Sequence, residues 1–130
     1  MARMVFGTNQ LTEGSWAQET LTSHNLVPGG FKLDAAAFSA GGDGKKRVAN
    51  GIVVGRTSAE RLSGAKFGPA ADADDEVFIV AFDVVDLAIN DDVTFYRPTR
   101  QVYENKLPGW GTLTPAVQGK VRVAYQCLVK

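Results

Sequence analysis

The side chains of this chain that could act as nucleophiles or as acids and bases are few and scattered. His24 is the only histidine and Cys127 the only cysteine, so a Ser-His-Asp or Cys-His arrangement would have to include one of them. His24 lies in a polar segment without other signs of a site, and we expect Cys127 to be a small strand residue of the core. Zinc needs about four Cys or His ligands, or three and a water. These residues therefore predict neither catalysis nor a metal cofactor.

Two groups of carboxylates are the remaining candidates for chemistry. Residues 72–76 carry four acidic side chains that could hold calcium, but their spacing lacks the glycine and the distal glutamate of an EF-hand loop. A solvated loop is the simpler interpretation. Asp83 and Asp86 lie at odd separation in a predicted strand region, so they would point to opposite faces. The glycines of residues 41–44 have neither P-loop nor dinucleotide-binding spacing. The sequence favours a protein that is not an enzyme and has no cofactor.

Composition narrows the class of partner. The chain has 130 residues, 45% of them apolar and 22% charged, with 14 basic and 14 acidic side chains. This predicts one globular domain, and the neutral balance argues against nucleic acid, whose phosphates attract an excess of Lys and Arg. No run approaches the roughly 20 apolar residues that cross a bilayer, and residues 1–6 do not resemble a signal peptide. A single cysteine suits synthesis in a reducing cytoplasm.

The elements that would position a functional surface are arranged around residues 77–85. Both alternating sets in this run are mostly apolar, which predicts a central strand with both faces covered. After an Asn-Asp turn signal come two shorter runs, 93–97 and 100–104, separated by Pro98-Thr99. This pattern is typical of a hairpin. The stretch ends in a rigid turn at residues 107–110.

Shorter elements are predicted before this stretch. Residues 31–33 form a short element, and 48–54 are a second strand candidate with a tight turn or bulge at Asn50-Gly51. The capping box from Thr57 to Glu60 should open about a turn and a half of helix, closed by Gly64.

The C-terminal segment predicts one helical turn and a strand. Thr114 can cap, Pro115 suits the first helical position, and Gly119 can end the turn. Residues 120–129 then alternate between two faces, which predicts a half-buried strand. The expected fold class is mainly β, with one or two short helical turns.

The first 30 residues have no clear period but keep large apolar side chains. A frayed terminus is one interpretation. The other is an extended N-terminal arm that docks on a neighbouring molecule, since a disordered tail rarely keeps such residues. A capping box at residues 15–18 could open a short helix within it. The candidate anchors of the arm are Phe6, Leu11, Trp16, Leu21 and Leu26.

The run VTFYRPTRQVYENKLPGW, residues 93–110, resembles a segment of the head decoration, or capsid cement, proteins of lambda-like phages. In that family a strand with Thr-Phe-Tyr leads to a second strand ending in Tyr and an acidic residue, then to a Leu and a Pro/Trp turn. The matching residues here are Thr94, Phe95, Tyr96, Tyr103, Glu104, Leu107, Pro108 and Trp110. The likeness extends in order over residues 31–128. The loop at 56–75 is longer than in the family, and an extra strand follows Trp110.

The resemblance implies a compact β-tulip-like barrel or sandwich at residues 31–130, with residues 1–30 as a capsid-binding arm. It implies a homotrimer on the outer surface of a virion head, over a shell of HK97-type major capsid protein. Such a protein would stabilise the head against the pressure of packaged DNA. It would involve neither nucleic acid nor membrane.

An alternative function is adhesion. A head-fibre-like or carbohydrate-binding β-module would use exposed aromatic side chains such as Trp110 or Tyr103. It would bind glycans as an isolated domain, without capsids. A small enzyme is the weakest hypothesis, because convergent titratable groups are lacking in the sequence.

Overall fold

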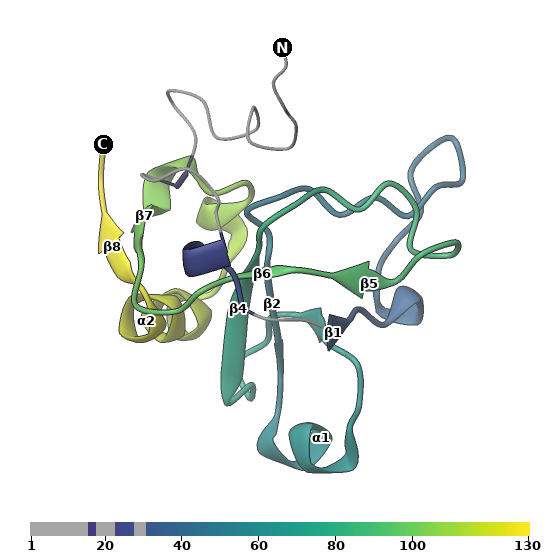
Figure 1. The fold of residues 1–130 in the computed structure, drawn as a ribbon, viewed down its shortest axis with the longest axis horizontal. Helices are drawn as coiled ribbons and strands as arrows, with labels where there is room; N and C mark the ends of the chain where they lie inside the picture. Colours follow the sequence, from purple (N-terminus) through teal and green to yellow (C-terminus); the bar gives the residue numbers. More distant parts are fainter. Residues whose placement is uncertain (1–15, 18–22, 28–30) are drawn as a thin grey trace.

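The computed structural model describes residues 16–17, 23–27 and 31–130, and it is mainly β with few helices (Figure 1). The strands are β1 (Phe31–Lys32), β2 (Val53–Arg56), β3 (Gly68–Pro69), β4 (Glu76–Val80), β5 (Asp92–Val93), β6 (Phe95–Tyr96), β7 (Gln101–Tyr103) and β8 (Gln126–Leu128). The helices are α1 (Ser58–Ser63) and α2 (Pro115–Ala124). Short 3₁₀ turns occupy Ser23–Asn25, Ala35–Ala37, Glu104–Lys106 and Trp110–Thr112. The sheets of the described residues do not close into a barrel.

Strand β4 occupies the middle of the largest sheet, as predicted. That sheet has the order β3-β2-β4-β6, and β4 pairs antiparallel with both β2 and β6. Ile79 and Val80 point to opposite faces and are both fully buried. The strand is shorter than the predicted run 77–85, because Val84 forms only an isolated bridge to Val48. Val85 is 64% exposed.

The predicted hairpin of residues 93–97 and 100–104 is wrong. Strand β6 pairs with β4, whereas β7 pairs in parallel with β8. Between them the chain turns at Thr99, a β-branched residue with a φ of +72°. The amide of Thr99 donates to the carbonyl of Ala124 at the end of α2, 2.7 Å away. This corner takes the chain out of the main sheet and onto α2.

The predicted end of the C-terminal helix at Gly119 is also wrong. So is most of the predicted strand at residues 120–129. Helix α2 begins at Pro115, capped by Thr114 as expected, but continues through Gly119, and β8 is left with three residues. The reason is a period of four that competes with the alternation: Val117, Val121 and Tyr125 are all buried. Val123, which the alternation would bury, is 90% exposed.

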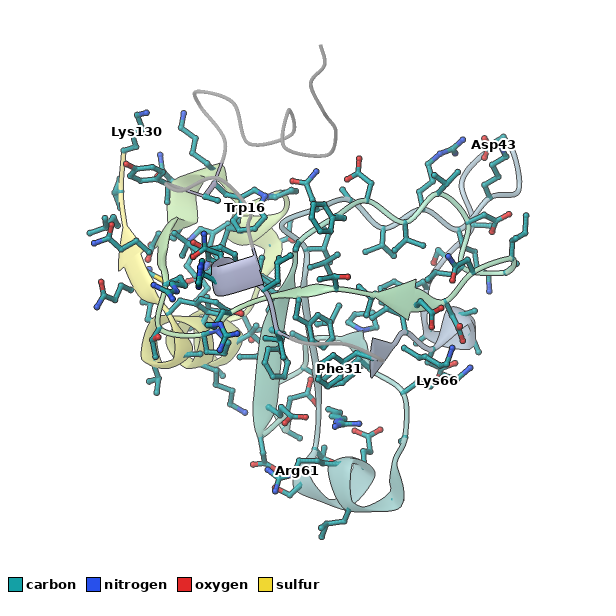
Figure 2. The ribbon with its side chains drawn as sticks, in the orientation of Figure 1. Trp16, Phe31, Asp43, Arg61, Lys66 and Lys130 are labelled. Atoms are coloured by element: carbon teal, nitrogen blue, oxygen red, sulfur yellow. The ribbon has the colours of Figure 1, made fainter. Side chains whose placement is uncertain are left out.

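The N-terminal segment is part of the domain as far back as Trp16, so the predicted boundary at residue 30 requires correction. Trp16 is 2% exposed, and its indole Nε1 donates to Asn50 Oδ1 over 2.7 Å (Figure 2). Ala17 forms a β-bridge to Val102, so the helix expected from residues 15–18 is not present at Ala17. Leu26 bridges Tyr96 and packs against the same core.

The interpretation of Trp16 and Leu26 as free anchors of an arm is therefore wrong, because both are used inside the domain. The other candidate anchors, Phe6, Leu11 and Leu21, lie outside the described residues.

Several local predictions are confirmed. Residues 31–33 form β1 and a bridge from Leu33 to Phe67. Helix α1 has the expected capping box from Thr57 to Glu60, and it ends at Gly64 in the left-handed region. Asn50-Gly51 is a tight turn, in which Gly51 has a φ of +90°. A Cβ at Gly51 would lie 2.7 Å from atoms of Trp16 and Pro108, so this glycine lets the N-terminal segment pack closely.

Candidate interaction surface

The residues that could carry out nucleophilic chemistry remain dispersed in the structure. His24 is exposed, and its backbone carbonyl accepts a hydrogen bond from Arg100. Cys127 lies half-buried on β8, as expected, with Sγ facing the carbonyl of Val121. Burial raises the pKa of the Cys127 thiol to about 11, so the thiol is protonated near neutral pH. Among the described residues, neither His24 nor Cys127 has the partners of an activated nucleophile.

The carboxylates of residues 72–76 each have a structural role. Asp72 accepts from Thr114 Oγ1, Asp74 from the amide of Ala71, Asp75 from the amide of Ser58, and Glu76 from Arg56 Nε. Among the described residues, no three His, Cys, Asp or Glu side chains are grouped so that they could hold a metal ion. The two carboxylates farther along also serve backbone turns: Asp83 accepts from the amide of Asn50, and Asp86 from the amide of Lys46.

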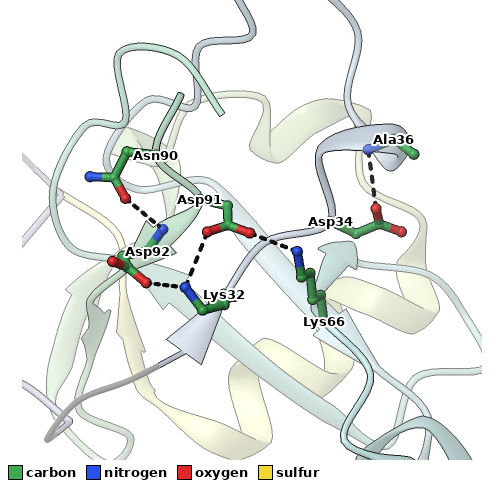
Figure 3. A network of polar contacts seen from close by, with 7 residues as sticks. All are labelled: Lys32, Asp34, Ala36, Lys66, Asn90, Asp91 and Asp92. Carbon is green, nitrogen blue, oxygen red and sulfur yellow. Dashed lines mark hydrogen bonds and ion pairs between the residues drawn. The ribbon is translucent and has the colours of Figure 1, made fainter. Parts of the chain in front are cut away.

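A charged network joins β1, β5 and the segment before β3 (Figure 3). Lys32 Nζ lies 2.6 Å from Asp92 Oδ1 and 3.2 Å from Asp91 Oδ1, and Lys66 Nζ lies 2.7 Å from Asp91 Oδ2. Hydrogen bonds from Lys66 and then Lys32 hold the pKa of Asp91 below its usual value. The Lys32 and Lys66 side chains are about half exposed, so solvent screens these ion pairs and the network adds only modest local order.

The residues that carry the family resemblance form the frame of the domain. Phe95 and Tyr96 are fully buried, and Tyr96 Oη donates to the carbonyl of Gln101. Glu104 is 9% exposed and accepts two hydrogen bonds from Arg122, at 2.9 and 2.7 Å. The remaining motif residues are Thr94, whose carbonyl accepts from Ala81, half-buried Tyr103, buried Leu107, exposed Pro108 and half-buried Trp110. Packing and hydrogen bonding within the domain therefore account for most of the residues of the motif.

Both aromatic residues considered for glycan binding have a cation over the ring. The Arg122 guanidinium lies 5.4 Å from the centre of the Trp110 ring, and the Lys130 ammonium lies 5.3 Å from that of Tyr103. Each cation occupies one face of its ring, so a sugar would have to stack on the other face or displace the cation.

Three of the most exposed aliphatic side chains lie away from these two aromatic residues, and sequence reasoning did not identify them as surface. Leu62 on α1, Ile89 before β5 and Val123 on α2 are 83%, 84% and 90% exposed. Val123 borders an open groove of about 570 Å³ between β4 and α2. The mainly apolar lining includes Val77, Phe78, Pro98, Ala116 and Ala124. An open apolar groove suits contact with another protein surface.

The comparisons with known proteins gave no match to a family model, a curated protein or a solved structure. In the described part of the chain, neither helix has the length and apolar character that crossing a membrane requires.

Proposed function

We propose that this chain is a phage capsid decoration protein, which binds the outer surface of a shell of HK97-type major capsid protein. The observation that carries the proposal is that aliphatic side chains are exposed at separate places on the domain. Most of the described polar side chains, in contrast, form hydrogen bonds within the domain itself. Ile89 and Val123 are 84% and 90% exposed, and among the described residues no group of three His, Cys, Asp or Glu side chains could hold a metal ion. Such a surface suits docking rather than catalysis. The resemblance of residues 93–110 to head decoration proteins supports a phage capsid as the surface to which the protein binds.

In this role the protein is a clamp across subunit seams. Packaged DNA presses outward on the shell, and area buried on both sides of a seam opposes its opening. The buried residues of β4 and β6 provide a stiff frame for such a clamp. The β-tulip-like fold and the homotrimer expected from the resemblance belong to this proposal. Three equivalent docking sites in a trimer would raise the overall affinity by effective concentration.

The proposed capsid-binding arm is shorter than the sequence suggested. Because Trp16 is a core residue, we limit the proposed arm to residues 1–15, whose apolar side chains include Phe6 and Leu11. Ordering a segment on docking costs free energy, which the burial of such apolar side chains must offset.

Co-sedimentation with emptied phage heads that lack this protein tests the proposal. The intact chain should pellet with heads, and a variant without residues 2–14 should remain folded but pellet much less. The circular dichroism spectrum and thermal midpoint of the variant provide the control for folding. An intact chain that stays in the supernatant, while it binds an array of glycans, would contradict the proposal and support adhesion.

A further inference from the structure

The corner between β6 and β7 carries two arginines without an acidic partner. Among the ion pairs of the described residues, none includes Arg97 or Arg100. Arg97 Nη2 donates to the carbonyl of Leu26 over 2.9 Å, and Arg100 Nη2 donates to that of His24 over 3.1 Å. The Nε atoms of both arginines are buried without a hydrogen-bond partner. The corner therefore holds cationic donors that the described part of the domain does not fully use.

The two cations are held on one short segment of backbone. Their acceptors, the carbonyls of His24 and Leu26, belong to residues two positions apart, whose Cα atoms are separated by at most about 7.6 Å. Charges at this spacing lie within about one Debye length, so they repel each other even at physiological salt. Carbonyl groups carry only partial charge and do not cancel two full positive charges. A bound anion would relieve this repulsion.

Arg100 lines an open polar hollow of about 310 Å³, which we call the corner site. In the described part of the chain its other lining residues are Thr99, Gln101 and Gln126, so no described carboxylate lines it. The parallel register of β7 and β8 pairs Gln101 with Gln126, which brings carboxamides from both strands to the same hollow. A guanidinium, two carboxamides and a hydroxyl all donate hydrogen bonds. Such a set of donors suits an anionic oxygen ligand.

The backbone of the corner site is fixed in an unusual conformation. Thr99 has a φ of +72°, which costs free energy in a β-branched residue, and strained residues of this kind concentrate at functional sites. Its amide donates to the carbonyl of Ala124 over 2.7 Å, and the amide of Gln126 donates to that of Arg100 over 3.0 Å. A glycine would adopt the same φ without strain, whereas Thr99 adds a hydroxyl to the lining.

We propose that the corner site binds an oxyanion, a carboxylate or phosphate group, with Arg100 as its charged donor. Gln101, Gln126 and the Thr99 hydroxyl provide neutral donors, and Arg97 adds positive potential from the same corner. A guanidinium recognises either kind of group through its planar set of N–H donors. The group can belong to an acidic side chain of a partner protein or to free phosphate, and the two sources are distinguished below.

Titration of the intact, isotope-labelled chain with sodium phosphate and with glutarate, followed by NMR, tests the proposal. Glutarate carries the carboxylate of a glutamate side chain. Ionic strength is held constant with NaCl, so that screening is not the variable. We expect saturable shifts of the amide signals of residues 99–101 and 126. Tighter binding of glutarate assigns the site to an acidic side chain, and tighter binding of phosphate assigns it to a phosphate group. Neither result depends on capsid binding.

Gln126→Glu is the most informative variant. Gln126 is exposed, and the change places a carboxylate in the corner site without touching the bonds from the arginines to the N-terminal segment. The new carboxylate takes the place of the ligand beside Arg100, so anion binding should weaken at least about tenfold, the scale of one charge-assisted hydrogen bond. Arg100→Gln should weaken it by a similar factor. Arg61→Gln is the matched control, because this exposed residue of α1 lowers the net charge by the same one unit.

Three results would overturn the proposal. The first is the absence of saturable shifts with either anion. The second is a Q126E variant that binds as tightly as the unmodified chain, which would leave the arginines with only the structural role of holding residues 24–26. The third is an equal loss of binding in R61Q, which would show a general effect of net charge. The thermal midpoint of Q126E, measured in parallel, should match that of the unmodified chain in the absence of anion.

Discussion

The two faces of β4 support apolar clusters that differ in chemistry. On one face Ile79 packs in a cluster with Trp16, Tyr96 and Tyr125. The polar atoms of these aromatic residues are bonded: Tyr125 Oη donates to the carbonyl of Tyr96 over 2.7 Å and accepts from the amide of Ile79. This cluster contains residues from Trp16 to α2, which are far apart in the sequence. Its hydrogen bonds therefore help to specify how these distant segments pack together.

On the other face four phenylalanine rings pack without hydrogen bonds of their own. Phe78 and Phe95 are stacked with centroids 4.7 Å apart, and Phe67 meets both edge-on. Phe31 completes the group. Contact area and ring geometry hold this cluster together. The difference predicts that the first cluster is sensitive to single polar atoms, whereas the second responds mainly to lost volume.

The largest effect is expected at Trp16. Trp16→Ala should lower the free energy of unfolding by about 4–5 kcal/mol, because it empties an aromatic core site and removes the donor to Asn50. Urea denaturation measures the change. The deletion of residues 2–27 should therefore unfold the domain, whereas deletion of residues 2–14 should not. A stable, folded protein after the longer deletion would show that the first cluster does not need its N-terminal member.

Phe95→Ala tests the second cluster and should cost about 3–4 kcal/mol, since Phe95 is fully buried. Because Phe78 of the same cluster is partly exposed, Phe78→Ala should cost less, about 2–3 kcal/mol. Phe95→Leu, which restores most of the volume, is the matched control. Equal thermal midpoints for F95A and F95L would contradict an account based on volume.

Tyr125→Phe isolates the hydrogen bonds of the first cluster at nearly constant volume. It should cost about 1–2 kcal/mol, because the carbonyl of Tyr96 and the amide of Ile79 both lose a buried partner. Amide hydrogen exchange at Ile79 should accelerate more than at residues of β2. If the variant matches the parent in both measurements, hydrogen bonding does not distinguish the two clusters.

Glu104→Gln should have the smallest effect, about 1 kcal/mol, since Arg122 is half exposed and solvent screens the pair. Hydrogen bonds from Arg122 hold the pKa of Glu104 below its ordinary 4.5. The stabilisation is therefore present above the unfolded-state pKa and is lost as pH falls through the lower, folded-state pKa. The difference in unfolding free energy between parent and E104Q should shrink from pH 6 toward about pH 3. A difference that grows over this range would contradict the pairing.

Local signals made part of this fold predictable. The capping box at Thr57 and the left-handed Gly64 act within one helical turn, so the sequence alone identifies α1. The central position of β4 follows from its two apolar faces. In contrast, residues 117–125 fit both a period of two and a period of four. Burial of Val117 and Val121 against the core decides for helix, and that burial is a tertiary property.

The candidate surface was less predictable than the fold. Trp16 looked like an arm residue because its partner, Asn50, is 34 positions away and nothing local indicates the contact. The run that resembles head decoration proteins was visible in sequence, but its residues Phe95 and Tyr96 are fully buried and add no surface. Ile89 and Val123 are exposed because no other segment of the domain packs over them. A local sequence pattern does not give this information.

A cryo-electron microscopy map of heads from a phage that carries this chain tests the proposed function most directly. The account predicts density for the domain on the outer surface of the shell, centred on threefold or quasi-threefold positions. Density on twofold positions or as isolated monomers would refute the trimer. Heads with no density for this chain on their outer surface would contradict the decoration function itself.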